Sequence, residues 1–262
     1  MLQTIAERLR QQYRTVPYPS AHPVLSERFM GRPHINAHTC TANAGCTACM
    51  EVCPTQALAL QEGTLGLDMG RCTFCGKCAK ACPQSALTFT KEYRLASSTR
   101  QGLWVFPSPE PADAPVPSQV QPFDHPMLPS LRRSCRLREV SAAGCNACEA
   151  DCNVLGTIVF DLPRFGIDYV ASPRHADGLL ITGPLPRNMQ LATQKCYTAV
   201  TPPKLVMAVG ACAISGGLFS GLEAEGEGAP AHLTVNLFIP GCPPHPYTIL
   251  DGMLRFLGKQ VP

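Results

Sequence analysis

Cysteine is the residue type through which this chain is best equipped to do chemistry, because eight of its 15 cysteines lie between residues 40 and 82. They form two consecutive runs, and each run ends in Cys-Pro. The second run reads Cys72-Thr-Phe-Cys75-Gly-Lys-Cys78-Ala-Lys-Ala-Cys82-Pro83. A loop with two residues between cysteines can bring three thiolates onto three iron corners of a cubane cluster, while a turn of helix carries the fourth cysteine out of reach. The run therefore predicts iron–sulfur binding.

The first run has a longer opening loop. It reads Cys40-Thr-Ala-Asn-Ala-Gly-Cys46-Thr-Ala-Cys49-Met-Glu-Val-Cys53-Pro54, with five residues instead of two between its first two cysteines. The insertion is small and flexible enough to bulge without moving Cys40 far, so we expect Cys40 to be a ligand. The alternative is a [3Fe–4S] site in which Cys40 is free.

This spacing resembles that of bacterial two-cluster ferredoxins, in which the fourth cysteine of each run serves the other cluster. The resemblance implies two [4Fe–4S] clusters in an α+β ferredoxin-like domain. The first cluster would be held by Cys40, Cys46, Cys49 and Cys82, and the second by Cys53, Cys72, Cys75 and Cys78.

Two other uses of paired cysteines remain alternatives for the tandem. Disulfides belong to oxidising compartments, and this chain shows no secretion signal at its start. Structural zinc also uses paired Cys-x2-Cys units, but zinc needs only four thiolates per ion and does not require Cys-Pro twice. Both alternatives explain the pattern less completely than iron–sulfur clusters do.

Composition limits the kind of partner. The formal charge is +3 and 16% of residues are charged, with no run of Lys and Arg, so we expect protein partners and no nucleic acid. No stretch reaches the roughly 18 apolar residues of a membrane span. Residues 1–14 place Leu2, Ile5, Leu9 and Tyr13 near helical spacing, which predicts a helix that packs on a partner subunit; a peripheral membrane contact is a weaker alternative.

The chain divides into four parts by composition. Residues 1–34 are predicted as a helix and an extended strap, and residues 35–97 as the two-cluster domain, with an internal repeat of a helical turn and a strand after each Cys-Pro. Eight prolines between Pro107 and Pro129 predict a stiff spacer, so residues 98–130 are assigned as a linker. Residues 131–262 form the last part.

This last part alternates apolar runs with longer segments, which predicts an α/β flavodoxin-like domain with a mostly parallel sheet. The expected strands are Cys135–Val140, Gly166–Val170, Gly178–Thr182, Lys204–Val209 and Leu233–Ile239. Four further cysteines follow three of these strands, at the sheet edge where such folds bind ligands: Cys145, Cys148, Cys212 and Cys242. Gly210, Gly216, Gly217 and Gly241 would let backbone approach their sulfur atoms.

Residues 131–262 resemble the small subunit of membrane-associated [NiFe] hydrogenases of the formate hydrogenlyase and energy-converting type, which is related to the complex I subunit NuoB. The matching text is Gly144-Cys-Asn-Ala-Cys-Glu149, Arg164-Phe-Gly-Ile, Ser172-Pro-Arg-His-Ala-Asp177, Gly210-Ala-Cys-Ala-Ile-Ser-Gly-Gly217 and Ile239-Pro-Gly-Cys-Pro-Pro244. Residues 1–97 resemble the two-cluster subunit of the same complexes. The chain is thus expected to be a fusion of two electron-transfer subunits.

The resemblance implies that Cys145, Cys148, Cys212 and Cys242 bind a third [4Fe–4S] cluster, beside the nickel–iron site of a separate large subunit. Glu149 would handle protons or stabilise the first turn of a helix. Cys135, Cys152 and Cys196 match no ligand position. Every Cys-x2-Cys pair of this chain is already assigned to iron–sulfur binding, so no nickel site and no catalytic residue are expected here.

The function implied is an oxidoreductase subunit that passes electrons from a donor to the hydrogenase large subunit. The donor would be formate dehydrogenase, carbon monoxide dehydrogenase or a ferredoxin, and membrane-arm subunits would hold the protein peripherally at the cytoplasmic face of the membrane. The alternative is a complex I-like quinone reductase module or a cluster-bearing binding protein. The two residues between Cys145 and Cys148 favour hydrogenase, because complex I relatives place these ligands side by side.

Overall fold

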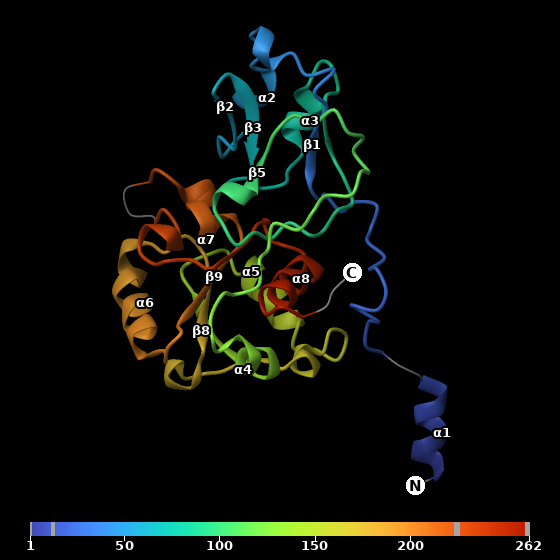
Figure 1. The fold of residues 1–262 in the computed structure, drawn as a ribbon, viewed down its shortest axis with the longest axis vertical. Helices are drawn as coiled ribbons and strands as arrows, with labels where there is room; N and C mark the ends of the chain where they lie inside the picture. The colour runs from blue at the N-terminus through green and yellow to red at the C-terminus, as the bar shows by residue number, and fades with distance from the viewer. Residues whose placement is uncertain (1, 12–13, 223–225, 260–262) are drawn as a thin grey trace.

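The computed structural model describes residues 2–11, 14–222 and 226–259. Figure 1 shows a smaller body, containing the two cysteine runs, above a larger body built around a parallel sheet. The first helix, α1 (Leu2–Gln11), stands apart at the opposite end of the molecule from the smaller body. The predicted helix is therefore present, although Tyr13 lies outside the described residues.

The smaller body holds two antiparallel sheets. One pairs β1 (Pro33–Ile35) with β4 (Leu87–Phe89), and the other has the order β2 (Leu58–Gln61), β3 (Thr64–Asp68), β5 (Trp104–Val105). Two short helices, α2 (Ala48–Glu51) and α3 (Lys77–Ala81), carry the middle of each cysteine run. Each Cys-Pro is followed by a residue with positive φ, Gln56 at 51° and Ser85 at 50°, and then by β2 or β4. The two halves thus repeat one local geometry.

The larger body has a five-stranded sheet in which every neighbouring pair is parallel. In spatial order its strands are β7 (Ile167–Tyr169), β6 (Cys135–Ser141), β8 (Gly178–Thr182), β9 (Leu205–Val209) and β10 (Leu237–Ile239). Numbered along the chain this is 2-1-3-4-5, the order of flavodoxin-like folds. The prediction of an α/β domain with a parallel sheet is confirmed.

All five predicted strands are present, but β10 begins four residues later than expected. The backbone at Asn236 still pairs with β9, since its N–H donates to the Val206 carbonyl at 2.8 Å. Its side-chain oxygen accepts from the Val206 N–H, also at 2.8 Å. The side chain thus takes the place of a strand carbonyl, and regular pairing starts only at Leu237.

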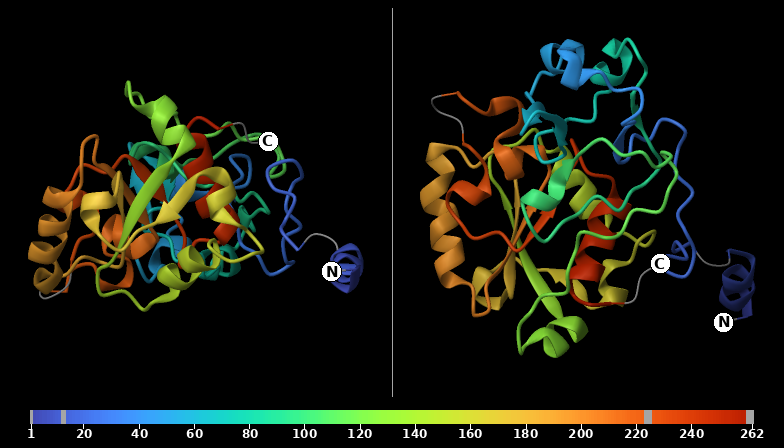
Figure 2. Two further views of the ribbon diagram at one scale, coloured as in Figure 1. Left: turned by 90° about the horizontal axis from the view of Figure 1, so that it is seen from below. Right: turned by 45° about the horizontal axis from the view of Figure 1, so that its top comes forward.

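Helices cover both faces of this sheet, as the two views of Figure 2 show. On one face, α6 (Arg187–Ala199) and α7 (Ala211–Ser215) pack with apolar residues such as Ile181 and Val206. On the other, α5 (Ala147–Val154) and α8 (Pro246–Phe256) pack with residues such as Leu180 and Met207. A short helix, α4 (Leu128–Arg133), leads into β6. The sheet is therefore buried on both sides, as parallel sheets usually are.

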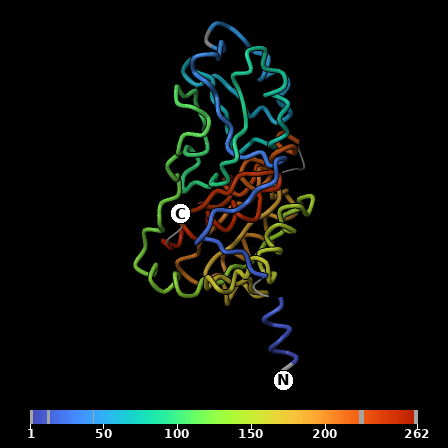
Figure 3. The backbone as a smooth tube through the Cα atoms, turned by 90° about the vertical axis from the view of Figure 1, so that its right-hand side faces the viewer, coloured from blue at the N-terminus to red at the C-terminus, as the bar shows by residue number. Residues whose placement is uncertain are grey.

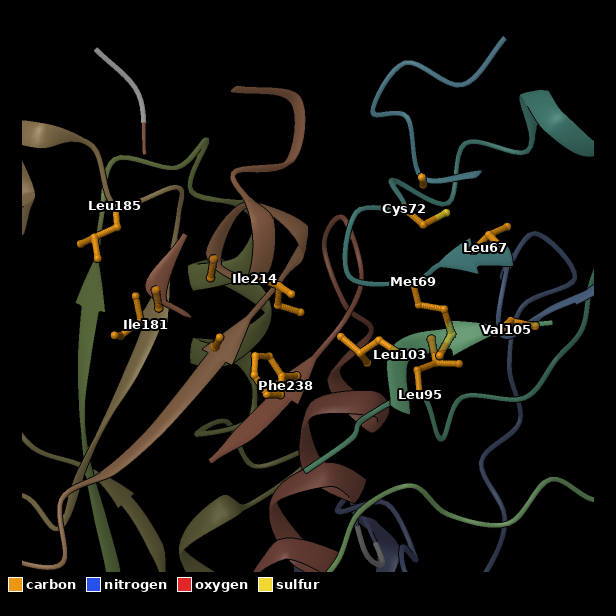
Figure 4. Packing of buried hydrophobic residues seen from close by; sticks show 14 of the residues in the cluster. Leu67, Met69, Cys72, Leu95, Leu103, Val105, Ile181, Leu185, Ile214 and Phe238 are labelled. Atoms are coloured by element: carbon orange, nitrogen blue, oxygen red, sulfur yellow. The ribbon is translucent and has the colours of Figure 1, made fainter. Parts of the chain in front are cut away.

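The two bodies share one apolar core. Met69 and Leu103 of the smaller body and Ile214 and Phe238 of the larger body belong to the same buried cluster, shown in Figure 4. The Ser215 hydroxyl donates to the Gly70 carbonyl at 2.9 Å across the contact. Because buried apolar residues of both bodies form this contact, the two bodies hold a defined orientation.

The proline-rich segment differs from the predicted spacer. Residues 104–105 form β5, which pairs with β3 through Leu67 and Val105. Farther on, Val120 is buried and the Phe123 N–H donates to the Phe256 carbonyl at 2.8 Å. The segment runs along the surface from the smaller to the larger body (Figure 3). Its prolines keep the chain extended, but its apolar residues pack on both bodies, so residues 98–130 are part of the folded structure.

The extended strap predicted to follow the first helix, within residues 1–34, contacts both bodies. The Arg164 guanidinium donates to the carbonyls of Val16 and Tyr18, at 2.9 and 2.8 Å. The Tyr18 hydroxyl donates to Asp251 Oδ1 of α8 at 2.8 Å, and its buried ring packs edge-on to Tyr93. Lys91 of the smaller body donates to the Phe29 carbonyl at 2.8 Å. The strap therefore fastens the smaller body to the larger one.

Candidate iron–sulfur sites

The four cysteines expected at the first cluster line one small cavity in the smaller body. Cys40, Cys46, Cys49 and Cys82 share its wall with apolar residues, including Ile35 and Leu65. The inserted loop forms a turn of 3-10 helix at Ala42–Ala44 and reverses at Gly45, where φ is 94°. The insertion therefore bulges outward, and Cys40 stays beside the other three residues.

A second cavity is lined by the cysteines expected at the second cluster: Cys53, Cys72, Cys75 and Cys78. Backbone N–H groups donate to sulfur in both cavities. Ala57 donates to Cys53 Sγ at 3.2 Å, and Ala86 donates to Cys82 Sγ at 3.3 Å. Each of these bonds spans the left-handed turn after Cys-Pro, so the proline and the turn serve to aim an N–H at sulfur.

The third set of cysteines meets at the carboxyl edge of the parallel sheet. Cys145 and Cys148 lie at the start of α5, Cys212 lies in α7, and Cys242 follows β10. Burial is the main cause that raises the pKa of the Cys148 thiol, and Cys212, Glu149, Cys242 and Cys145 add smaller electrostatic contributions, so all four cysteines face one region. Cys145 and Cys242 are exposed, which leaves one side of this set open.

Two glycines make room for sulfur in this third set. A Cβ at Gly210, where φ is 90°, would lie 2.5 Å from Cys148 Sγ, and a Cβ at Gly217 would lie 3.0 Å from Cys212 Sγ. The other two predicted glycines have different neighbours, because a Cβ at Gly216 would meet the Gly226 carbonyl oxygen and one at Gly241 would meet Pro244. Close backbone approach to sulfur is thus a property of Gly210 and Gly217.

The donor sets fit iron–sulfur clusters. Among the described residues, no three Cys, His, Asp or Glu side chains are gathered as the ligands of one metal ion would be. A cubane has separate iron corners, so its thiolates surround a small volume, as the four cysteines of each cavity do. N–H groups directed at sulfur are also a means of setting cluster potential.

Burial favours the protonated form of three of these thiols, which belong to the second and third sets. Burial, with smaller contributions from neighbouring thiolates, raises the pKa of Cys72 to about 12 and those of Cys78 and Cys212 to about 11. Because iron–sulfur clusters are bound by thiolates, insertion of a cluster at these residues would release protons. Burial also raises the pKa of Cys135 to about 12, and Cys135 and Cys152 are fully buried among apolar residues, which is the environment of an inert core cysteine.

Glu149 is held in place rather than exposed. It is 5% exposed, and its Oε1 accepts hydrogen bonds from Ser141 and Thr182, each at 2.7 Å. These hydroxyls come from the ends of β6 and β8, so Glu149 joins α5 to the two central strands beside Cys148. The sequence pointed to the residue but not to these partners.

The spatial order of the three sets could not be read from the sequence. Helix α2, which carries Cys49 of the first set, contacts helix α3, which carries Cys78 of the second. Thr73 and Phe74, in the loop of the second set, line one cavity together with Cys242 of the third. The second set therefore lies between the other two. No spacing rule relates Cys75 to Cys242, because they belong to different domains.

Comparisons with known proteins agree with this division of the chain. Residues 39–86 match a family described as "4Fe-4S dicluster domain", and residues 145–256 match "NADH ubiquinone oxidoreductase, 20 Kd subunit". The probable membrane-bound hydrogenase subunit mbhJ of Pyrococcus furiosus is 38% identical over 131 residues, which are 49% of this chain and 77% of the relative. An NADH-quinone oxidoreductase subunit of Citrifermentans bemidjiense is 39% identical over 116 residues, 44% of this chain and 68% of the relative. The chain belongs to the 20 Kd subunit family.

Another member similar to this chain is formate hydrogenlyase subunit 7 of Escherichia coli, at 36% identity over 148 residues. The match covers 56% of this chain and 58% of the relative. These names are those of oxidoreductase subunits, so the predicted resemblance of both parts of the chain is confirmed. None of the helices in the described residues is long and apolar enough to cross a membrane.

Cys40 is the predicted ligand whose assignment depends most on local geometry. We expect Cys40→Ser to disrupt the first cluster and leave the other two intact, because its cavity shares no cysteine with theirs. Iron in the anaerobically purified protein should fall from about 12 to about 8 per chain, with one reduced-cluster signal lost from the electron paramagnetic resonance (EPR) spectrum.

Cys196→Ser is a matched control for this prediction, since Cys196 is half-buried on α6 and belongs to none of the three sets. It should leave iron and all three EPR signals unchanged. An unchanged spectrum in Cys40→Ser would show that the bulged loop has removed Cys40 from the site.

Proposed function

We propose that this chain is the electron-transfer subunit of a membrane-associated [NiFe] hydrogenase complex of the formate hydrogenlyase type. It would bind three [4Fe–4S] clusters, as one-electron carriers, through the twelve cysteines of the three sets, with the smaller body adopting a ferredoxin-like fold. The observation that carries the proposal is the row formed by the three sets, in which α2 of the first set contacts α3 of the second, and the loop after Cys72 lines a cavity with Cys242 of the third.

The two ends of this row differ in their surroundings, which suggests where electrons would enter and leave. The first set lies at the end of the row away from the sheet, where the donor would deliver electrons. The third set has Cys145 and Cys242 exposed, and the large subunit that carries nickel would cover it there. The apolar contact of Met69 and Leu103 with Ile214 and Phe238 holds the second set against the third.

Association with the membrane would be peripheral and indirect, through membrane-arm subunits at its cytoplasmic face. The names of two relatives, a membrane-bound hydrogenase subunit and a formate hydrogenlyase subunit, support this part of the proposal. The donor would be formate dehydrogenase, carbon monoxide dehydrogenase or a ferredoxin.

Metal content is the first test of the proposal. Anaerobically purified protein should hold about 12 iron and about 12 sulfide per chain, the content of three cubanes. Chemical analysis of both elements, with zinc as a control, measures this directly. About 8 of each would mean that one set is not a cluster site, and zinc without sulfide would refute the proposal.

A complex I-like quinone reductase module is the second candidate, because NADH-quinone oxidoreductase subunits match the same part of the chain. The separation of Cys145 from Cys148 by two residues favours hydrogenase. Nickel analysis of the complex isolated with this chain separates the two candidates. A complex that contains iron and sulfide but no nickel, and that reduces quinone, would favour the second.

A further inference from the structure

A wide groove on the smaller body is not part of any cysteine set. Its volume is about 910 Å³, and no cysteine lies among the described residues that line it. Its walls come from the strap at residues 22–25, from β1 and β4, and from the proline-rich segment within residues 105–117. A groove of this volume falls in the range of ligand-binding clefts. Electron transfer between the three sets does not use it, so it is free for another task.

The Phe106 ring in this groove is exposed but held in place. It is 47% exposed, and it stacks on Trp104 with the ring centroids 6.2 Å apart and the planes at 17°. A Cβ at Gly66 of β3 would lie 3.1 Å from the Phe106 ring, so this ring packs directly on the strand. Aromatic side chains offer large apolar areas at interfaces. Phe106 is therefore a preformed contact for an apolar group.

Arg32 supplies an unused cation. Its backbone is fixed, since its N–H donates to the Glu92 carbonyl at 2.9 Å and its carbonyl accepts from the Thr90 N–H at 3.0 Å. Half-buried Arg32 lines the groove, and its guanidinium has no hydrogen-bond partner in the part of the chain that the structure describes. Burial lowers the pKa of Arg32, and the charge of Glu92 opposes this effect.

The Glu92 carboxylate is itself bound by another arginine. The backbone N–H and the Nε of Arg94 both donate to Glu92 Oε1 at 2.8 Å, and the Arg94 Nη2 donates to Oε2. Arg32 therefore keeps a planar set of donors, whose geometry matches a carboxylate from outside the chain.

The remaining charges of the groove limit the kind of ligand. The Lys91 ammonium is occupied, because it donates to the carbonyls of Ser26 and Phe29 at 3.2 and 2.8 Å. Glu110 and Asp113 are exposed on the proline-rich wall. These two carboxylates repel a polyanion such as a nucleotide and attract a cation. The groove thus complements a ligand with an apolar body, one carboxylate and one cation.

We propose that this groove binds an extended segment of a partner protein. Apolar side chains of the segment pack on Phe89 and Phe106, an acidic residue binds Arg32, and a basic residue faces Glu110 and Asp113. A polypeptide carries these three kinds of group at separate positions along one chain. Arginine and aromatic residues, which the groove presents, are also enriched in protein–protein interfaces.

The position of the groove indicates which partner uses it. Phe89 of β4 lines both the groove and the cavity of the second set, and Ile35 of β1 lines the cavity of the first set. The β1–β4 sheet therefore stands between the groove and both sets. A segment bound here fastens the electron donor to the smaller body, close to where electrons enter. The assignment to the donor rests on the proposed function, whereas the binding of a segment does not.

The first test is photo-crosslinking in the complex isolated with this chain. A benzophenone-bearing amino acid in place of Phe106 should crosslink to one partner subunit. Mass spectrometry should locate the crosslink in a segment that has an acidic and a basic residue among apolar ones. The same amino acid in place of Leu60 is the control, because Leu60 is 48% exposed on the smaller body but lies outside the groove, and it should not reach that segment. Crosslinks from position 106 only to lipid, to a second copy of this chain or to nothing would overturn the inference.

The second test measures binding of a synthetic peptide with the sequence of the crosslinked segment to the purified full chain. Arg32→Gln should weaken binding by about 10- to 100-fold, the loss expected for a charge-assisted hydrogen bond. Replacing the acidic residue of the peptide by its amide should cost about the same, and the two changes together should add little to either alone.

Arg28→Gln is the matched control, because Arg28 is an exposed residue of the strap that does not line the groove. It removes the same charge and should leave binding unchanged. Phe106→Ala gives an independent variant at an exposed side chain and should also weaken binding. Iron and sulfide contents check that each variant is folded.

Unchanged affinity in both Arg32→Gln and Phe106→Ala would overturn the inference, and so would equal losses in Arg32→Gln and Arg28→Gln. Peptide binding by a wild-type chain that holds no clusters would instead refute the proposed function and leave the binding of a segment intact. A crosslink to a subunit without a redox cofactor would overturn the assignment to the donor.

Discussion

Replacement of Cys242 by serine should abolish hydrogen turnover by the assembled complex while the clusters of the smaller body stay reducible by the donor. Cys242 is the member of the third set that follows β10, and the set forms only when three strand ends meet. A serine hydroxyl is a poor substitute for a soft thiolate at iron. Hydrogen-driven reduction of an artificial dye and donor-driven hydrogen formation, measured on the same preparation, test this expectation.

Cys78→Ser is the counterpart of Cys242→Ser, because Cys78 belongs to the second set, in the smaller body. It should block electron delivery from the donor, because the second set lies between the first and the third. Hydrogen-driven dye reduction should survive, since the dye can accept electrons at the third site. Equal loss in both assays for both variants, with subunit assembly verified, would contradict this division of labour.

Gly210→Ala should remove the third cluster without touching a ligand. The added Cβ would lie 2.5 Å from Cys148 Sγ, and the backbone there has φ of 90°, a region that alanine disfavours. Iron and sulfide should fall from about 12 to about 8 per chain, and the EPR signals of the smaller body should persist.

Gly221→Ala separates the two causes of this loss. Gly221 has almost the same φ, 85°, but a Cβ there would meet nothing within 4 Å. It should cost about 1–2 kcal/mol of backbone strain and keep all three clusters. If both variants lost the third cluster equally, strain and not the contact with Cys148 would be the reason.

Much of the site could be anticipated because cysteine spacing acts locally. The two-residue gaps at Cys72, Cys75 and Cys78 determine a loop, and the structure places these residues around one cavity with Cys53, as expected. The five strands could be found because parallel strands are buried on both faces and are therefore apolar throughout. These features depend on residues close together in sequence.

Features that depend on distant residues escaped prediction. The prolines of residues 98–130 indicate an extended chain, but they do not reveal that Leu103 is fully buried or that Val105 pairs with β3. Likewise, nothing near Tyr18 in the sequence points to Asp251. Tertiary contacts decide these positions, and a pattern within one segment does not contain them.

The hydrogen bond between Tyr18 and Asp251 joins residues that are 233 positions apart. During synthesis, Tyr18 therefore leaves the ribosome long before Asp251. The eight cysteines of the smaller body and β5 are available well before then, whereas the third set waits for Cys242. Synthesis thus imposes an order: the cysteines of the first two sets are all available before the third set is complete, and Tyr18 can bind Asp251 only after α8 has been made.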